Sequence, residues 1–112
     1  MYTILAYAIP EESKGILQKA LSERARIIFC SEKSGLFSEL RASEYDLLFL
    51  FVADSREQTA LLEKVYRLIP HTPVIVISPE ENAETVVAAI RSGAFDYLVH
   101  PVSEVRYKVA TG

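Results

Sequence analysis

The sequence of 112 residues has one cysteine, no tryptophan and only four glycines. With Cys30 alone, the chain can form neither an internal disulfide nor a metal site built from several cysteines. No apolar run approaches the roughly 18 residues that a membrane-spanning helix needs. The first residues, Met-Tyr-Thr-Ile, lack the basic leader of a secretory signal. We therefore expect a cytoplasmic protein that does not enter a membrane.

Positive charge is also scarce. The chain has 12 Lys and Arg against 15 Asp and Glu, which gives a net charge of −3. Nucleic-acid surfaces neutralise phosphates with clustered cations, and the sequence has no prominent cluster of that kind. We therefore expect no direct contact with nucleic acid. Because 50% of the residues are hydrophobic, residues 1–112 have enough apolar material for the core of one domain.

Short apolar runs alternate with amphipathic stretches along the chain. The runs predict strands at 2–8, 26–30, 46–53, 73–78 and 95–99. The stretches predict helices that begin at Pro10 and that cover 33–42, 57–69, 83–92 and 103–110. Strands joined through helices are parallel, so the fold class is α/β, a (βα)5 three-layer sandwich. The first, third and fourth strands are the most apolar, which favours the strand order 2-1-3-4-5.

The helix predicted at 83–92 shows how boundaries and faces are inferred. Asn82 is a residue type that caps helix starts, and Gly93 stands where a left-handed residue often ends a helix. Between them, the spacing of Val86, Val87 and Ile90 predicts that all three face the core.

Two segments carry a resemblance to a known family. Residues 73–78 read PVIVIS and residues 88–101 read AAIRSGAFDYLVHP. They resemble the second half of a response-regulator receiver domain, where a strand ends in Ser or Thr. In that family a helix then ends near Ala-x-x-x-Gly-Ala, followed by Asp-Tyr-Leu and a Lys-Pro pair. Residues 45–48 (YDLL) are similar to the opening of the family's third strand. The resemblance implies a flavodoxin-like fold and covers nearly the whole chain, most densely between residues 73 and 101.

Three departures from the family pattern bear on function. The family holds Mg²⁺ with adjacent acidic residues at the end of the first strand, and the matching positions here are Ala8 and Ile9. Its phosphoacceptor aspartate ends the third strand, where this chain has Phe51. Its lysine before proline is replaced by His100. The family's Lys-Pro bond is typically cis, so the resemblance implies a cis bond between His100 and Pro101.

These departures remove the groups that phosphoryl transfer needs. The reaction requires a nucleophilic oxygen, a divalent ion and a cation for the developing charge, and Mg²⁺ prefers oxygen ligands. Ala8, Ile9 and Phe51 have no side-chain oxygen. We therefore expect no metal, no cofactor and no aspartyl phosphate at this position. Asp54, three residues further on, is an alternative acceptor, but a role at the start of the next helix is the favoured interpretation.

The remaining matching positions leave two interpretations open. Ser78 is either a retained switch hydroxyl or a strand-end serine that caps the following turn. Tyr97 matches the family's aromatic switch position, or it is a half-buried strand tyrosine. His100 is either a pH-sensitive group or a tolerated replacement, and the second is favoured. Phe51 is expected to fill the space of the acidic pocket, and Cys30 to act as a small core hydrophobe.

The leading hypothesis is a receiver-like regulatory domain in signal transduction that is not phosphorylated and works through protein–protein contacts. The resemblance implies a protein partner or a homodimer on the face formed by the fourth helix, fifth strand and fifth helix. On this chain that face would include Arg91, Asp96, Tyr97, Glu104, Arg106 and Lys108. We expect residues 1–112 to be the N-terminal part of a longer regulator that controls an effector domain, such as a transcription regulator.

The alternative hypothesis is a small-ligand sensor that uses the crevice at the carboxyl ends of the first and third strands. Residues 8–12 contain no glycine and carry two carboxylates, which disfavours phosphate ligands there. An enzyme is the least favoured class, since no Ser/His/Asp, Cys/His or paired-carboxylate arrangement converges on the crevice.

Overall fold

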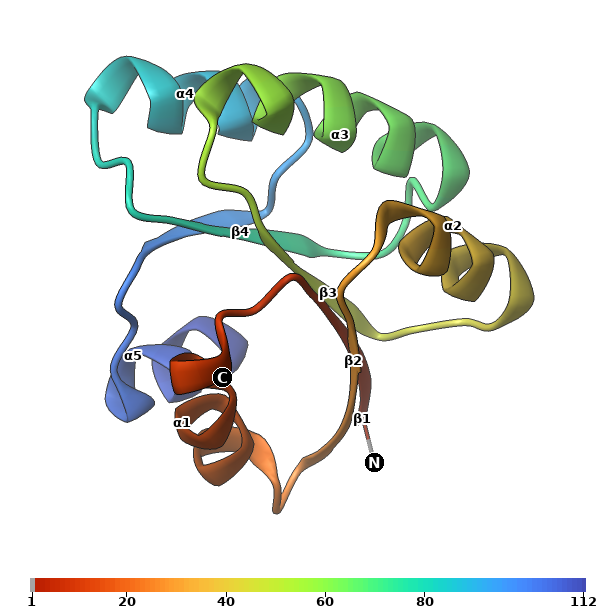
Figure 1. Cartoon of the computed structure of the whole chain (residues 1–112), viewed down its shortest axis with the longest axis vertical. Helices are drawn as coiled ribbons and strands as arrows, with labels where there is room; N and C mark the ends of the chain where they lie inside the picture. Colours follow the sequence, from red (N-terminus) through yellow and green to blue (C-terminus); the bar gives the residue numbers. More distant parts are fainter. Residues whose placement is uncertain (1) are drawn as a thin grey trace.

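A computed structural model describes residues 2–112, which form one parallel sheet between two layers of helices (Figure 1). The sheet has the order β2-β1-β3-β4-β5, as the sequence predicts. Its strands are β1 (Tyr2–Tyr7), β2 (Ala25–Cys30), β3 (Leu47–Phe51), β4 (Val74–Ser78) and β5 (Asp96–Val99). The helices are α1 (Glu11–Leu21), α2 (Lys33–Ala42), α3 (Ser55–Leu68), α4 (Ala83–Arg91) and α5 (Glu104–Thr111). Figure 1 shows α1 and α5 on one face of the sheet and α2, α3 and α4 on the other.

Side chains alternate between the two faces along the central strands, so each face has its own core cluster. Leu48 and Leu50 of β3 belong to the cluster under α2, α3 and α4. Phe49 of the same strand belongs to the cluster under α1 and α5, where its ring meets Tyr107 of α5 edge-on at 5.7 Å. Because every residue of β4 is buried, the sequence shows a continuous apolar run there in place of polar alternation.

Helix starts follow local capping chemistry. The Asn82 side chain accepts a hydrogen bond from the N–H of Glu84, and Ser103 caps α5 through the N–H of Arg106. Gly93 has φ +116°, so the predicted left-handed end of α4 is confirmed. Pro10 is the N-cap residue of α1, so the helix begins at Glu11, one residue after the predicted start.

The predicted burial of α4 is wrong in part. Val86 packs against the core, but Val87 and Ile90 are 46% and 44% exposed, and Ala89 is the buried residue of this helix. The physical reason is position: α4 contacts α3 and the edge strand β5, so only one narrow row of its residues faces the core. Apolar residues flanking that row remain at the surface.

Within residues 2–112, no helix combines the length and apolar character needed to cross a bilayer.

Candidate functional site

The parallel strands bring their carboxyl ends, and most of the predicted site residues, to one edge of the sheet. Ala8 follows β1, Phe51 ends β3, Ser78 ends β4 and His100 follows β5. Phe51 pairs in register with Ile77, the residue before Ser78. The positions singled out from the sequence therefore share one edge, where the crevice is expected in this topology.

The side of this edge formed by β1 and β3 is apolar. Ile9 is buried in the cluster under α1 and α5, and Phe51 packs against the same cluster. The Phe51 ring lies edge-on to the His100 ring, with centroids 5.3 Å apart and an interplanar angle of 84°. This packing places hydrocarbon and imidazole at the position that the resemblance associates with an acidic pocket.

The donor set at this position does not fit Mg²⁺. Ala8, Ile9 and Phe51 contribute no side-chain oxygen, and divalent magnesium needs several oxygen ligands in near-octahedral arrangement. Across residues 2–112, no group of three or more His, Cys, Asp or Glu side chains is placed to hold a metal ion. No chemical step through a metal can be derived for these residues.

The backbone at the first of these positions is strained. Ala8 has φ +57°, and it is the only residue other than glycine with a positive φ in the described part of the chain. A left-handed conformation costs an L-residue about 1–2 kcal/mol. The Ala8 N–H donates to the carbonyl of Cys30 at 2.8 Å, which ties the strained turn to the end of β2.

His100 connects the apolar side of the edge to β4. Its backbone N–H donates to the Ser78 carbonyl at 2.8 Å, and its bond to Pro101 is cis, as the resemblance implies. Its Nδ1 atom is buried and has no hydrogen-bond partner among the described residues.

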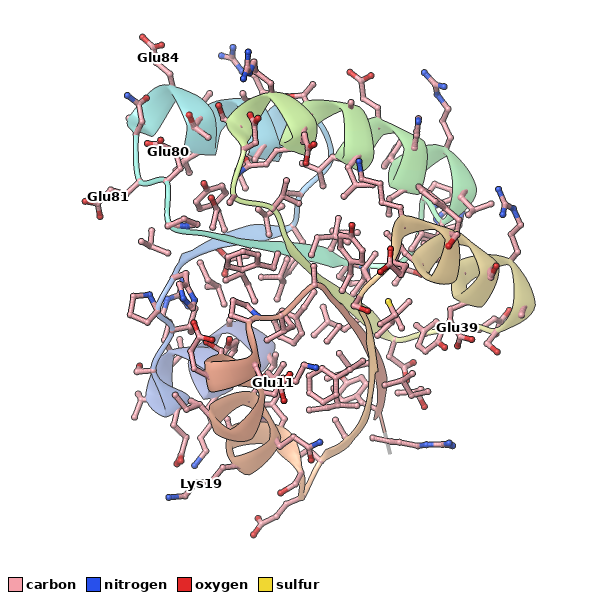
Figure 2. The ribbon with its side chains drawn as sticks, in the orientation of Figure 1. Glu11, Lys19, Glu39, Glu80, Glu81 and Glu84 are labelled. Atoms are coloured by element: carbon pink, nitrogen blue, oxygen red, sulfur yellow. The ribbon has the colours of Figure 1, made fainter. Side chains whose placement is uncertain are left out.

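Ser78 is fully buried at the end of β4. Its Oγ accepts a hydrogen bond from the N–H of Glu80 at 3.1 Å, as expected of a strand-end serine that caps the following turn. The carboxylate of Glu80 in turn accepts from the N–H of Asn82 at 2.9 Å. Figure 2 shows Glu81 and Glu84 pointing outward at this corner.

Tyr97 is more buried than expected of a half-buried strand tyrosine or of a residue on the predicted partner face. It is only 7% exposed, so it is buried beneath the surface to which the sequence assigned it. Its hydroxyl donates to the Glu80 carbonyl at 2.6 Å and accepts from Gln58 Nε2 at 3.4 Å. Tyr97 is buried because it lies on the face of β5 that α4 covers, and the Tyr97 ring joins the core cluster there.

Gln58 is the site residue that the sequence interpretation missed. It lies in the first turn of α3, is 1% exposed, and donates from Nε2 to the Val52 carbonyl at 3.0 Å. A signal was present, because Gln58 stands three residues before Leu61 on the apolar stripe of α3. A polar residue on such a stripe needs a buried partner.

Asp54 caps α3, which agrees with the favoured sequence interpretation. Its Oδ1 accepts from the backbone N–H of Arg56 at 2.8 Å and lies 3.5 Å from Arg56 Nε. The hydrogen bond from the Arg56 backbone is the main cause that lowers the pKa of the Asp54 carboxyl. The Asp54 carboxylate thus already accepts a hydrogen bond at the start of α3.

Cys30 packs against the core cluster under α2, α3 and α4. Burial, with a smaller effect from Glu39, raises the pKa of its thiol to about 11. The thiol therefore stays protonated near neutral pH, which fits a small hydrophobe better than a nucleophile.

The α4–β5–α5 surface combines apolar residues with ion pairs. Phe95, between α4 and β5 in the chain, is 68% exposed, and Val87 and Ile90 of α4 are also exposed. Asp96 and Arg106 form an ion pair of 3.6 Å between β5 and α5. Glu104 pairs with Lys108 at 3.1 Å on α5 and with Lys19 of α1 at 3.8 Å, and Arg91 is exposed.

Comparison with known proteins gives relatives in sequence and in structure. No protein-family model matches the chain. The chain is 36% identical over 83 residues, 71% of its length, to the nitrogen assimilation regulatory protein NtrX of Azorhizobium caulinodans. Its structure is similar to a response regulator from Thermotoga maritima, with a TM-score of 0.92, 20% identity and coverage of 99% and 94% of the two chains.

A third relative links the sequence and structural comparisons. The structure of NtrX from Brucella abortus matches 98% of this chain with a TM-score of 0.84 and 25% identity. The chain spans only 18% of the Azorhizobium protein and 25% of the Brucella chain. The similarity is therefore to one part of these longer regulators.

Proposed function

Because this chain is a response-regulator receiver domain in its sequence and fold, we propose that it regulates through protein contacts without being phosphorylated. The observation that carries this proposal is the side-chain chemistry at three positions. Ala8, Ile9 and Phe51 provide neither a nucleophilic oxygen nor oxygen ligands for Mg²⁺ where the family pattern places them. Asp54 is the acid nearest to Phe51 along the chain, and its carboxylate caps α3.

The test is incubation of the chain with Mg²⁺ and a small-molecule phosphodonor, followed by intact mass measurement. We expect no added mass. In parallel, beryllofluoride with Mg²⁺ should leave the amide NMR spectrum unchanged, and a receiver domain that carries the acidic pair and the aspartate serves as the positive control. Stoichiometric modification, or saturable shifts around Asp54, would overturn the proposal.

The α4–β5–α5 face is the surface that we propose for partner contact. Exposed Phe95 and Ile90 supply apolar area, and the nearby Asp96–Arg106 pair supplies charges of both signs. Aromatic and aliphatic anchors provide most of the energy in interfaces, while mixed charges provide specificity. Ile90→Ser should weaken self-association or partner binding, measured by sedimentation velocity. Ile16→Ser, at a similarly exposed position on α1, should not.

The larger context is also a proposal. Two of the matched relatives, the NtrX proteins of Azorhizobium caulinodans and Brucella abortus, are much longer than this chain. A receiver that controls an effector domain of a transcription regulator would have this arrangement, with residues 1–112 as its N-terminal part. Expression of the full-length gene product, with and without residues 1–112, tests this: removal of the domain should change the effector's activity.

The small-ligand sensor has no observation in its favour. Ile9 is buried, and the rings of Phe51 and His100 pack against one another at the crevice. A thermal-shift screen with nucleotides and metabolites should therefore give no saturable stabilisation.

A further inference from the structure

Gln58 joins three separate segments through its side-chain amide. Its Nε2 donates to the carbonyl of Val52, just after β3, and to the hydroxyl of Tyr97 in β5. The Tyr97 hydroxyl in turn donates a hydrogen bond to the carbonyl of Glu80 in the β4–α4 loop. The Glu80 N–H then donates to Ser78 Oγ at the end of β4. A continuous series of hydrogen bonds thus runs from the first turn of α3 to the loop that precedes α4.

The polarity of this series is fixed by its acceptors. The Val52 carbonyl can only accept, so it requires the NH₂ side of the Gln58 amide. The Tyr97 hydroxyl has one hydrogen, which the Glu80 carbonyl takes at 2.6 Å, so the lone pairs of that oxygen face Gln58. If the amide were flipped, Gln58 Oε1 would face the Val52 carbonyl oxygen and the lone pairs of the Tyr97 hydroxyl, and neither contact would contain a hydrogen. Only one orientation of Gln58 satisfies its two neighbours.

Stability alone does not explain a glutamine at this position. Gln58 is 1% exposed, and its Oε1 is buried without a hydrogen-bond partner among the described residues. An unpaired buried carbonyl is costly, and a long polar side chain loses rotamer freedom on burial. A leucine would continue the apolar stripe of α3 with no unpaired carbonyl and with a smaller loss of rotamer freedom. The hydrogen bonds to Val52 and Tyr97 are what a leucine could not provide.

We propose that Gln58 is a positioning residue that holds the Tyr97 ring and the β4–α4 loop in one arrangement. The ring lies in the core cluster that also contains Ala89, the buried residue of α4, so its place affects how α4 sits on the sheet. All the groups in this series belong to the chain itself. The α4–β5 face is then presented to a partner in a fixed shape, without a phosphorylation signal. Its functional consequence rests on the contact surface proposed above.

The experiment compares three variants of the full 112-residue chain, labelled with ¹⁵N and with ring-labelled tyrosine. Gln58→Leu removes the amide, and Tyr97→Phe removes the hydroxyl and also assigns the Tyr97 ring signal. Gln18→Leu makes the same chemical change at an exposed position of α1, in the other helix layer, and is the matched control. The readouts are the Tyr97 ring resonance and the hydrogen exchange of the Glu80 and α4 amides.

We expect Gln58→Leu to shift or broaden the Tyr97 ring resonance and to speed exchange at these amides by about tenfold, since buried hydrogen bonds are lost. Tyr97→Phe should reproduce the faster exchange, whereas Gln18→Leu should stay within about twofold of wild type. Should Gln58→Leu not fold, Gln58→Met, which keeps the side-chain length, takes its place. An unchanged Tyr97 signal and unchanged exchange in a folded Gln58 variant would overturn the positioning role.

The two proposals fail in different ways. Phosphorylation of the wild-type chain would overturn the proposed function and would leave the effect of Gln58→Leu on Tyr97 as it is. Loss of the Gln58 effect would leave the phosphodonor result as it is.

Discussion

At the carboxyl edge of the sheet, the side formed by β1 and β3 presents hydrocarbon, whereas the side formed by β4 and β5 holds buried hydrogen bonds. On the first side, Ile9 and Phe51 pack into the core, and Phe51 meets His100 edge-on. On the second side, the hydroxyls of Ser78 and Tyr97 both engage the backbone of Glu80. The two sides are neighbours in one sheet, but the first is apolar and the second is polar and hydrogen-bonded.

This difference separates two requirements of a receiver-type fold. Metal-dependent chemistry at the edge requires oxygen ligands. The β1–β3 side instead has apolar packing, and burial of a phenylalanine side chain stabilises by roughly 1.5–3 kcal/mol. Transmission to α4 requires only that a loop and a buried ring keep a defined geometry. The β4–β5 side meets that requirement with its own hydrogen bonds, each of which contributes about 1 kcal/mol.

The largest expected effect comes from returning a carboxylate to the apolar side. Phe51→Asp removes a packed ring and places a charge beside Ile9 and His100, so we expect a loss of about 3 kcal/mol in the free energy of unfolding. Urea denaturation at neutral pH measures it. Phe51→Leu, which keeps the position apolar, should lose about 1 kcal/mol. If Phe51→Asp were as stable as wild type, the β1–β3 side would not be an apolar packing site.

The fold could be predicted almost entirely from the sequence, because its signals are local and repeated. The continuous apolar run of β4 predicted a central strand, and Asn82 and Gly93 predicted the limits of α4. The error at Val87 and Ile90 arose because periodicity gives a helix its apolar stripe but not the width of the surface that covers it. That width depends on the position of α4 at the sheet edge, which is a tertiary fact.

The candidate site could be predicted less completely. The resemblance located Ala8, Ile9 and Phe51, and the structure places them at one edge with unsuitable chemistry for a metal. The hydrogen bonds of Tyr97 and Gln58 join residues 39 positions apart, and nothing in the sequence pairs them. Gln58 could have been suspected from its place on an apolar stripe, but its partners are defined only by how β3, β4 and β5 lie together.

The second-largest expected effect comes from removing the Ser78 hydroxyl on the β4–β5 side. Ser78→Ala leaves the Glu80 N–H without its acceptor in a partly buried setting, so we expect a loss of about 1.5 kcal/mol in unfolding free energy. Chemical denaturation measures the loss, and Ser43→Ala is the control, since Ser43 is exposed at the end of α2. The control should change stability by less than about 0.5 kcal/mol. Equal effects of the two variants would show that Ser78 contributes no more than a surface serine.

Two buried tyrosines sharpen the comparison, because one has partners for its hydroxyl and the other has none. Tyr97→Phe should cost about 1 kcal/mol, since it removes a hydroxyl that donates to Glu80 and accepts from Gln58. The Tyr107 hydroxyl is buried without a partner among the described residues, so Tyr107→Phe should be neutral or stabilise by up to about 1 kcal/mol. Thermal and urea unfolding of both variants provide the measurement.

The alkaline pH dependence gives a second readout for Tyr107. Burial raises the pKa of Tyr107 to about 12, above its ordinary value of 10.0. Above pH 10 the unfolded chain can release this proton while the folded chain keeps it, so stability falls as the pH rises from 10 toward 12. Tyr107→Phe should flatten this decline. A decline as steep as that of wild type would show that other groups cause it.

The smallest expected effect concerns the backbone of the apolar side. Ala8→Gly relieves a left-handed conformation at φ +57°, but glycine also makes the unfolded chain more flexible, so we expect a net gain of about 0.5 kcal/mol. Ala60→Gly, at an exposed position inside α3, has only the flexibility cost and should lose about 1 kcal/mol. Urea midpoints at equal m-values measure both. Opposite signs would establish that the β1–β3 side holds a strained turn in solution; a loss in Ala8→Gly equal to that in Ala60→Gly would refute it.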